Sequence, residues 1–345
     1  MNTLIDRRYF LQTGAAVALT SALPRALFAA GTAFADIPRS DYSFATSCDE
    51  VAASYDLAGK TVLITGCNSG LGYESMRTLA AHGAQVIGAA RTQDKAEQAC
   101  ASVSGKTVPV VCELTDMESV VQCAAAVQAL DVPVDILICN AGIMALPELE
   151  QVEVNGVVLE KQFVVNHLGH YLLTRRLLPQ VQAAPAGRIV MVSSVGYTLA
   201  PEGGIQFDNL SGAAGYQAFK AYGQTKLANI LFSNELSRRY GGNATSGKGL
   251  TSNAIHPGLV GTNLGRYMTG KMRDPDAPLR KGMKTAAQGA ATQVYVAIDA
   301  RLDGVSGFYF EDCNPVETKG PYAGDEELAE RLWAVSAELV EPFMA

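Results

Sequence analysis

Short apolar runs rich in β-branched residues alternate with segments of helical periodicity along most of this 345-residue chain. Continuous apolar runs of this length are typical of parallel strands that are buried on both faces. Their alternation with helical segments predicts an α/β fold in which helices cover both faces of one doubly wound parallel sheet of about seven strands. The predicted strands are residues 61–65, 85–89, 108–112, 136–139, 188–192, 251–256 and 307–310.

A glycine-rich turn joins the first predicted strand to the first predicted helix. Thr65-Gly-Cys-Asn-Ser-Gly-Leu-Gly72 follows the apolar strand directly, and a helical pattern continues to Gly83. This arrangement aims free backbone N–H groups at an anion, and glycine lets the main chain approach a pyrophosphate closely. We interpret it as a dinucleotide-binding turn; the alternative is a turn without a ligand. The predicted cofactor contacts here are Gly66, Asn68, Ser69, Gly70, Leu71 and Gly72.

The residue after the second predicted strand indicates which dinucleotide is bound. A carboxylate at this strand end would hold the ribose hydroxyl of NAD(H), whereas an arginine suits the 2′-phosphate of NADP(H). Here Arg91 follows Ala90, and the first carboxylate is Asp94. The sequence therefore favours NADP(H) over NAD(H), against the alternative that Arg91 is an ordinary solvated loop residue.

Tyr222 and Lys226 form a candidate general acid/base pair. They are four residues apart in a segment of helical character, so their side chains lie on one helix face. A free tyrosine ionises near pH 10, and a neighbouring cation lowers that pKa. Lowering it by about three units requires about 4 kcal/mol, to which the lysine and a cationic cofactor ring would contribute. The pair suits proton transfer at a carbonyl or alcohol, although this spacing also occurs on solvated helices.

These motifs together resemble the short-chain dehydrogenase/reductase family, over about residues 58–340 and in the family's order. The glycine turn is similar to its TGxxxGxG signature. Cys139-Asn-Ala-Gly142 is similar to its NNAG motif, with Cys139 in place of the first Asn. His256-Pro-Gly-Leu-Val-Gly-Thr262 resembles the segment that contacts the nicotinamide side. The resemblance implies a Rossmann fold and further cofactor contacts at Asn140, Ala141, Gly142, Tyr222, Lys226, Pro257, Gly258 and Thr262.

The resemblance also implies a catalytic set of Asn166, Ser194, Tyr222 and Lys226. Tyr222 would exchange a proton with the substrate oxygen, and Ser194 would hydrogen-bond that oxygen as charge develops on it. Lys226 would lower the pKa of Tyr222 and hold the ribose, and Asn166 would hold a water that relays protons to Lys226. In isolation, Ser194 could equally cap a turn and Asn166 could satisfy the backbone of a kinked helix.

Within the family, residues 166–170, 220–229 and 325–333 resemble the retinol dehydrogenase-like branch, which is related to light-dependent protochlorophyllide reductase. This implies an NADP(H)-dependent oxidoreductase that interconverts an apolar alcohol and its aldehyde or ketone by hydride transfer. The alternatives are a C=C reductase resembling protochlorophyllide reductase and a non-catalytic dinucleotide sensor on the same fold. A pure sensor has no need for a proton-transfer set.

Three segments that follow predicted strand ends are expected on the substrate side: residues 143–162, 195–221 and 259–283. Apolar side chains in them would form a wide apolar pocket if they face inward; the alternative is that they pack the loops. The side chains concerned are Met144, Leu146, Tyr197, Tyr216, Phe219, Leu264, Tyr267, Met268 and Met272.

The histidines and cysteines give no metal signal. His167 and His170 could share a helix face, but no partner stands at ligand spacing, so we expect structural roles and no metal. The seven cysteines are compatible with a reduced interior, and the sequence indicates no pairing. Cys67 and Cys139 could be neighbours near the cofactor, where a disulfide between them would be disruptive.

The first 35 residues resemble a bacterial twin-arginine signal peptide. Arg7 and Arg8 precede a small-residue apolar run, and Ala33-Phe-Ala35 offers a cleavage site. The run is short for a membrane span. We therefore expect a leader over 1–35, an extension over 36–57, and the Rossmann domain over 58–345, with the mature protein in the periplasm. The alternative is a retained leader on a cytoplasmic or membrane-associated protein.

The net charge limits the classes of molecule that the protein is expected to bind. The net charge of −7 gives no basic surface for a nucleic acid. The expected partner is a small apolar alcohol or carbonyl compound, and homo-oligomerisation is left open.

Overall fold

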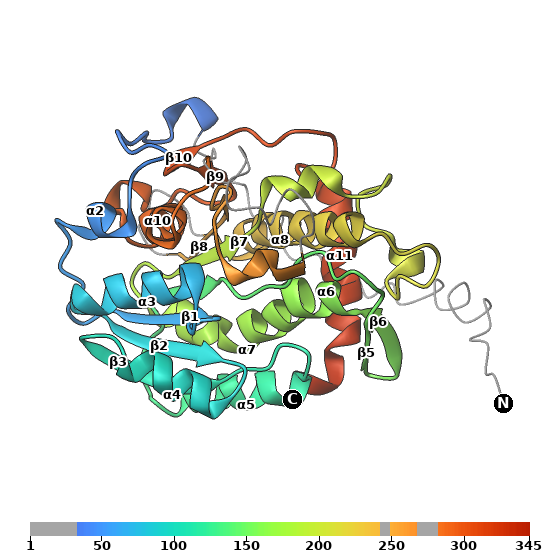
Figure 1. The fold of residues 1–345 in the computed structure, drawn as a ribbon, viewed down its shortest axis with the longest axis horizontal. Coiled ribbons are helices and arrows are strands. Elements are labelled where there is room, and N and C mark those ends of the chain that lie inside the picture. The colour runs from blue at the N-terminus through green and yellow to red at the C-terminus, as the bar shows by residue number, and fades with distance from the viewer. Residues whose placement is uncertain (1–32, 242–248, 268–281) are drawn as a thin grey trace, which may run out of the picture. The chain divides into compact units, whose positions relative to one another are not determined.

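The computed structural model describes residues 33–241, 249–267 and 282–345, and they contain an eight-stranded sheet (Figure 1). Its order is β10-β9-β8-β7-β4-β1-β2-β3, and every neighbouring pair is parallel except β9 and β10. The seven predicted strands are confirmed, with β10 as an antiparallel addition at one edge. The strands are β1 (Thr61–Thr65), β2 (Gln85–Ala90), β3 (Lys106–Val111), β4 (Ile136–Cys139), β7 (Arg188–Val192), β8 (Thr251–His256), β9 (Tyr309–Glu311) and β10 (Asn314–Pro315).

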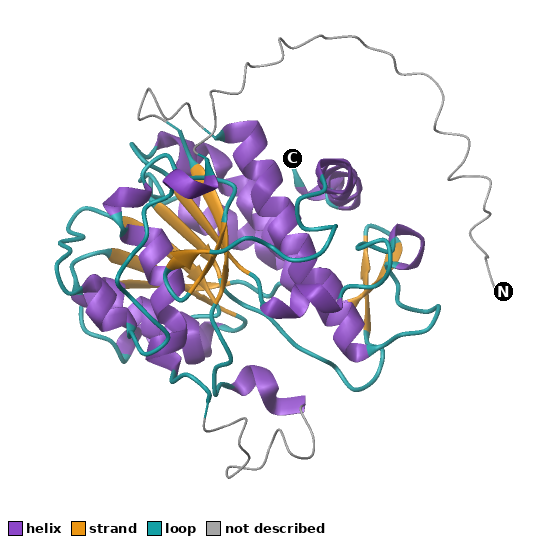
Figure 2. Ribbon diagram, turned by 90° about the horizontal axis from the view of Figure 1, so that it is seen from above, coloured by secondary structure: helices purple, strands orange, loops and turns teal. Residues whose placement is uncertain are grey.

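Helices cover both faces of this sheet, as the sequence predicts (Figure 2). Successive strand residues point to opposite faces: Leu63 of β1 belongs to one hydrophobic cluster, and Val62 and Ile64 belong to the other. The helices on the Val62 side are α2 (Cys48–Ala52), α3 (Gly70–Ala81), α4 (Gln93–Ala101) and α10 (Ala286–Ile298). Those on the Leu63 side are α5 (Met117–Gln128), α7 (Gly169–Ala183), α8 (Ala218–Tyr240) and α11 (Glu326–Leu339).

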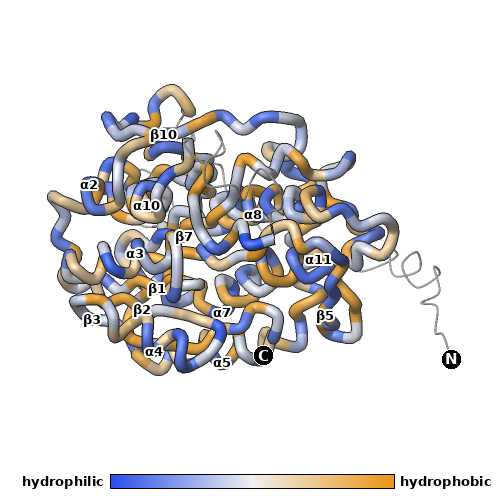
Figure 3. Tube along the Cα trace, viewed as in Figure 1, coloured by the Kyte–Doolittle hydropathy of each residue, from blue (hydrophilic) through white to orange (hydrophobic). Residues whose placement is uncertain are grey.

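The outer helices are amphipathic, and hydrophobic and hydrophilic stretches alternate along them (Figure 3). In α11, for example, Leu332 and Trp333 are buried while Glu327 and Glu330 face solvent. Asp116 caps α5, since its carboxylate accepts hydrogen bonds from two backbone N–H groups at the start of the helix.

A two-stranded hairpin, β5 (Gln151–Val154) and β6 (Val157–Glu160), forms a separate sheet (Figure 2). These strands lie in residues 143–162, which are expected on the substrate side and carry no strand prediction. Its turn residues Asn155 and Gly156 both have positive φ, at 51° and 74°. Asn-Gly is a strong hairpin signal for that reason, so the pair was a usable indication.

The helix that follows the hairpin is interrupted. It begins as α6 (Lys161–Phe163), continues as a π-helical turn over Val164–Leu168, and becomes α7 at Gly169. π-Helical turns are rare and occur often at functional sites, and Asn166 lies in this one. The remaining short helical turns within the described ranges are Phe34–Asp36, Val195–Leu199, Phe207–Asn209, Asn263–Tyr267, Ala300–Leu302 and Glu341–Phe343.

The segment between residue 33 and β1 folds with the rest of the described chain. Ile37, Cys48, Val51 and Leu57 are buried in the same cluster as α3 and α10. The predicted leader lies outside the described residues except for its last three positions, of which Phe34 packs against Phe308. Across the described ranges, no helix combines the length and the apolarity needed to cross a membrane.

Candidate active site

Four segments with predicted functions follow the carboxyl ends of β1, β4, β7 and β8. Since β8-β7-β4-β1 are consecutive parallel neighbours, these segments meet at one edge of the sheet. The chain runs outward from β1 through β2 to β3 and then crosses to β4 on the other side of β1. Ligands of doubly wound folds bind at such a reversal of strand order.

The glycine turn after β1 has the geometry of an anion cradle. Gly66 and Gly70 have φ of 72° and 57°, which glycine adopts without strain. A Cβ atom on Gly72 would lie 2.3 Å from the carbonyl oxygen of Gly66, so α3 packs directly against the turn. The side chain of the N-cap, Ser69, makes no capping hydrogen bond within the described structure. The first N–H groups of α3 are therefore suited to an anion.

A hydrogen-bond network joins the ends of β1 and β4. The Thr65 hydroxyl accepts hydrogen bonds from the backbone N–H groups of Asn140 and Ala141, both at 3.0 Å, and contacts His170 Nε2 at 2.8 Å. His170 Nδ1 lies 3.1 Å from the carbonyl oxygen of Asn166, so Nδ1 carries the proton and Nε2 accepts from Thr65. Burial lowers the pKa of His170 to about 4, which keeps the ring neutral.

His170 therefore has a structural role, as the sequence predicts. His167 is also buried, with Nε2 at 2.8 Å from Ser336 Oγ. Among the described residues, no group of histidine, cysteine and carboxylate side chains is arranged to hold a metal. Thr65 and His170 were not assigned to the site by sequence reasoning, although Thr65 opens the glycine motif.

Asn166 links the segment after β4 to α8. Its side-chain Oδ1 accepts from the Ile143 N–H at 2.8 Å, while Nδ2 donates to the Ile143 carbonyl and to Thr225 Oγ1, both at 2.9 Å. The amide thus satisfies backbone groups of another segment rather than those of its own helix. A Cβ atom on Gly142 would lie 3.2 Å from Asn166 Oδ1 and 3.6 Å from Lys226 Nζ, so both groups flank Gly142.

Lys226 and Tyr222 both lie on the buried face of α8, with 3% and 4% of their surface exposed. Lys226 Nζ donates to the Val192 carbonyl at 3.0 Å and lies 5.6 Å from the Tyr222 ring centroid. Burial lowers the pKa of Lys226 to about 8. The lysine is therefore held between the end of β7 and the segment after β4.

The expected lowering of the Tyr222 pKa is wrong for this structure. Burial raises the pKa of Tyr222 to about 12, and a hydrogen bond with Ser194 opposes that rise. Desolvation disfavours the phenolate, and Lys226 directs its ammonium to a carbonyl instead of supplying a compensating charge.

Ser194 is next to Tyr222. Its Oγ accepts from the Gly196 N–H at 3.0 Å, so the capping role that was considered for it is present. A Cβ atom on Gly196 would lie 3.0 Å from Tyr222 Cε1 and 3.3 Å from Ser194 Oγ. Glycine at this position therefore leaves room for the two hydroxyl-bearing side chains to approach each other, a feature that the sequence analysis did not identify.

The remaining predicted cofactor residues lie around the same edge. Thr262 packs against the glycine turn, because a Cβ atom on Gly70 would lie 3.2 Å from Thr262 Cγ2. Pro257 and Gly258 precede it in the segment after β8, with Gly258 at φ 86°. Arg91 is exposed immediately after β2, the strand beside β1.

The predicted substrate-side residues divide into two groups. Leu146 and Tyr197 are buried, and Tyr216 donates from its hydroxyl to the Leu146 carbonyl at 2.7 Å, so these residues hold the loops together. Phe219 and Tyr267 are exposed, at 43% and 38%; Met144 and Leu264 are half-buried. Met268 and Met272 lie outside the described residues. Five further exposed apolar residues of these segments were not singled out from the sequence: Val157, Val158, Val195, Leu199 and Leu259.

All seven cysteines are buried and free. The expectation that Cys67 and Cys139 are neighbours is wrong, because they belong to hydrophobic clusters on opposite faces of the sheet. Cys67 lies beside Cys100 of α4, whereas Cys139 Sγ is 3.7 Å from Thr174 Oγ1 of α7. Cys139 ends β4, whereas Cys67 lies in the turn after β1, and the two side chains lie on opposite faces of the sheet.

Comparison with known proteins agrees with this geometry. The family model described as short chain dehydrogenase matches residues 60–272, and the chain belongs to this family of oxidoreductases. It is 39% identical over 313 residues to the short-chain dehydrogenase TIC 32 B, chloroplastic, of Brassica napus, covering 88% of this chain and 95% of that protein. It is 37% identical over 312 residues to retinol dehydrogenase 13 of Homo sapiens, covering 87% and 89%.

A solved structure shows the same fold. A crystal structure of an uncharacterized protein from Mycobacterium Paratuberculosis matches with a TM-score of 0.65 and 33% identity, covering 84% of this chain and 97% of that one. The family assignment made from the motifs is therefore confirmed, as is the likeness to retinol dehydrogenases.

Proposed function

We propose that this protein is an NADP(H)-dependent oxidoreductase that interconverts an apolar alcohol and its aldehyde or ketone, with Tyr222 as general acid/base. The observation that carries the proposal is the convergence of four side chains at one sheet edge. Lys226 Nζ and Asn166 Oδ1 flank Gly142, and Tyr222 and Ser194 meet beside Gly196. A protein that only binds a dinucleotide has no need for this proton-transfer set, which argues against the sensor alternative.

The residues present fit a dinucleotide. The start of α3 offers N–H groups to a pyrophosphate, and the absence of a side chain at Gly72 lets that helix close on the turn. Arg91 supplies an exposed cation after β2 for a 2′-phosphate. When bound, the nicotinamide would supply or accept the hydride.

Residues of the chain would then transfer the proton to the substrate oxygen. With its pKa near 12, Tyr222 is protonated at neutral pH and suited to donate to a carbonyl oxygen. Ser194 would hydrogen-bond the same oxygen as negative charge grows on it. Lys226, whose pKa is about 8, exchanges its own proton near neutral pH, and Asn166 beside it would hold the water that connects it to solvent.

An apolar substrate is supported by exposed apolar side chains on the segments around the site. Val195 and Leu199 follow β7, Phe219 begins α8, and Leu259 and Tyr267 follow β8. Scattered surface apolar residues are normal, but here they gather on segments that leave the carboxyl edge of the sheet. The likeness to retinol dehydrogenases points to the same class of substrate.

Replacement of Tyr222 tests the proposal directly. Tyr222→Phe removes only the hydroxyl, so we expect kcat to fall by about a hundredfold or more while NADP(H) affinity changes less than threefold. Activity is measured on a panel of long-chain and cyclic alcohols, with enones included to detect C=C reduction. Tyr295→Phe is the matched control, because Tyr295 is buried in α10 on the opposite face. Full activity in Tyr222→Phe would refute the assignment.

We further infer export through the twin-arginine route. Arg7 and Arg8 before the apolar run support it, and export in the folded state would let the enzyme leave the cytoplasm with its dinucleotide. In a bacterial host, the wild type should appear in the periplasmic fraction with about one nucleotide per chain. Replacing both arginines with lysine should leave it in the cytoplasm. The inference would be contradicted if the wild type and the double-lysine variant were distributed equally between periplasm and cytoplasm. It would also be contradicted if the periplasmic protein contained no nucleotide.

A further inference from the structure

Lys284 lies outside the catalytic set but beside the segment that follows β8. It directly precedes Thr285, the N-cap of α10, and only 2% of its surface is exposed. Its ammonium pairs with Asp312 Oδ1 at 2.5 Å and lies 5.1 Å from the centre of the Phe44 ring. A buried lysine is costly unless its charge is compensated, and the Asp312 carboxylate supplies that compensation here.

Both the backbone and the side chain of Lys284 hold residues 258–261. Its N–H donates to the Leu259 carbonyl at 2.8 Å, and its carbonyl accepts from the Gly261 N–H at 3.2 Å. A Cβ atom on Gly258 would lie 2.9 Å from Lys284 Cδ, so the aliphatic stem lies against the Gly258 backbone. The loop is therefore fixed from one side by this residue.

The held loop reaches the dinucleotide turn. One residue beyond Gly261, Thr262 packs against Gly70 at the start of α3. The contact joins the segment after β8 to the first helical residue of the predicted pyrophosphate site. A displacement of residues 258–261 would therefore also displace the start of α3, where the nucleotide is expected to bind.

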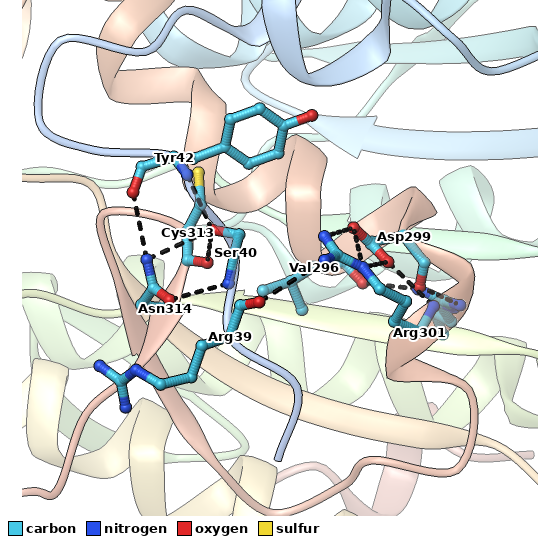
Figure 4. A network of polar contacts seen from close by, with 9 residues as sticks. Arg39, Ser40, Tyr42, Val296, Asp299, Arg301, Cys313 and Asn314 are labelled. Carbon is cyan, nitrogen blue, oxygen red and sulfur yellow. Dashed lines mark hydrogen bonds and ion pairs between the residues drawn. The ribbon is translucent and has the colours of Figure 1, made fainter.

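The partner of Lys284 is itself held in place. Asp312 and Cys313, in the turn between β9 and β10, have φ of 49° and 58°, a left-handed conformation that costs energy for residues other than glycine. Contacts from the N-terminal segment stabilise the turn (Figure 4): Ser40 Oγ donates to the Cys313 carbonyl at 2.8 Å, and Asn314 Nδ2 donates to the Tyr42 carbonyl at 3.2 Å.

We propose that Lys284 is a positioning residue for nucleotide binding. The Asp312 carboxylate fixes its ammonium, its stem and backbone fix residues 258–261, and these fix Thr262 against the glycine turn. Residues 40–42 brace the turn that carries Asp312, so the N-terminal extension contributes to the site from a distance. The inference rests on the proposed function, because it assigns a further residue to the same nucleotide site.

The test compares nucleotide affinity with turnover. Lys284→Met keeps the aliphatic stem and removes the charge, so NADP(H) Kd should rise about tenfold while kcat at saturating nucleotide stays within threefold. Lys284→Arg, which can still pair with Asp312, should restore most of the affinity. Lys60→Met is the matched control, since Lys60 pairs with Asp135 at 2.9 Å at the start of β1, the opposite end of the strand from the glycine turn.

Two milder substitutions test the same chain of contacts if Lys284→Met does not fold. Asp312→Asn removes the charged partner, and Ser40→Ala loosens the turn from outside the site. Both should raise NADP(H) Kd at least threefold. A lowered Tm with unchanged Kd in these variants would overturn the inference and leave Lys284 a structural residue. Wild-type protein that fails to bind NADP(H) at all would instead overturn the proposed function.

Discussion

The hydroxyl of Tyr222 is protonated at neutral pH in this structure, because burial raises its pKa to about 12. Proton donation to a carbonyl is therefore the easier direction, and alcohol oxidation requires a cation near the phenolate. Lys226 Nζ lies 5.6 Å from the ring centroid but donates to the Val192 carbonyl, and it does not offset the effect of burial on the Tyr222 pKa. The positive charge of an oxidised nicotinamide would act in the required direction.

Arg91 is expected to determine which dinucleotide is preferred. Its exposed side chain follows β2, so a 2′-phosphate would gain a charge-assisted hydrogen bond worth about 1.5–3 kcal/mol. Arg91→Ala should therefore raise NADP(H) Kd by about 10- to 100-fold while changing NAD(H) Kd less than threefold, as measured by titration of the intrinsic fluorescence. Lys106→Ala, an exposed cation at the opposite end of the neighbouring strand, should change neither. An equal loss for both nucleotides would refute the 2′-phosphate role.

The sequence motifs proposed a set of site residues that the fold brings to one sheet edge, but they did not predict the electrostatic state of those residues. Asn166, Ser194, Tyr222 and Lys226 were found by spacing and motif order. The pKa of Tyr222 depends on how completely the fold removes it from water, and that follows from packing between distant segments. Gly196 was missed for the same reason, since its role is visible only once Tyr222 lies against it.

At the scale of elements, the turn from β1 into α3 leaves no room for a side chain at Gly72. A methyl group on Gly72 would lie 2.3 Å from the Gly66 carbonyl and 2.5 Å from Asn140 Nδ2. Both contacts are shorter than real Cβ contacts, so α3 would have to shift away from the turn. The helix start and the β1–β4 connection would be displaced together.

Gly72→Ala should therefore weaken nucleotide binding by at least tenfold and lower the free energy of unfolding by about 1–3 kcal/mol, the usual range for overpacking. Calorimetric titration with NADP(H) and urea unfolding measure the two effects. Gly324→Ala is the control, because a Cβ atom there meets nothing within 4 Å and its φ is not positive. Normal affinity in Gly72→Ala would show that α3 tolerates a different position.

Element boundaries were well predicted wherever strands are buried on both faces, as in β1, β4 and β7. The exceptions lie at the periphery. The hairpin β5–β6 carries exposed valines at 157 and 158, so apolar and polar residues alternate only weakly along its strands. The Asn155-Gly156 turn was therefore the one sequence signal for this hairpin. Asn166, in the π-helical turn, hydrogen-bonds to Ile143 and Thr225 of other segments, and a local sequence pattern cannot reveal such contacts.

For the molecule as a whole, three buried histidines predict sensitivity to acid. Burial is the main cause that lowers the pKa of His167 to about 3 and those of His170 and His256 to about 4. The unfolded chain binds protons at about pH 6.5, where the folded chain still excludes them. The free energy of unfolding is therefore unaffected by protonation of these histidines above pH 6.5 and falls as the pH decreases towards 4. The loss is up to about 1.4 kcal/mol per pH unit for each histidine.

Urea unfolding at pH 7.5 and at pH 4.5 should show this loss. His167→Gln removes one titrating group, so the difference between the two free energies of unfolding should shrink by about 1–3 kcal/mol relative to the wild type. Replacing the exposed Lys106 with glutamine should leave the difference unchanged. The explanation fails if the wild type and His167→Gln lose the same stability on acidification.

The bonds between Ser40 and the turn at Cys313 and Asn314 span more than 270 positions along the chain. During translation, Ser40 leaves the ribosome long before its partners exist. Its attachment must therefore await the emergence of the last strands, and the braced form of the Lys284 loop is among the latest parts of the fold to be completed.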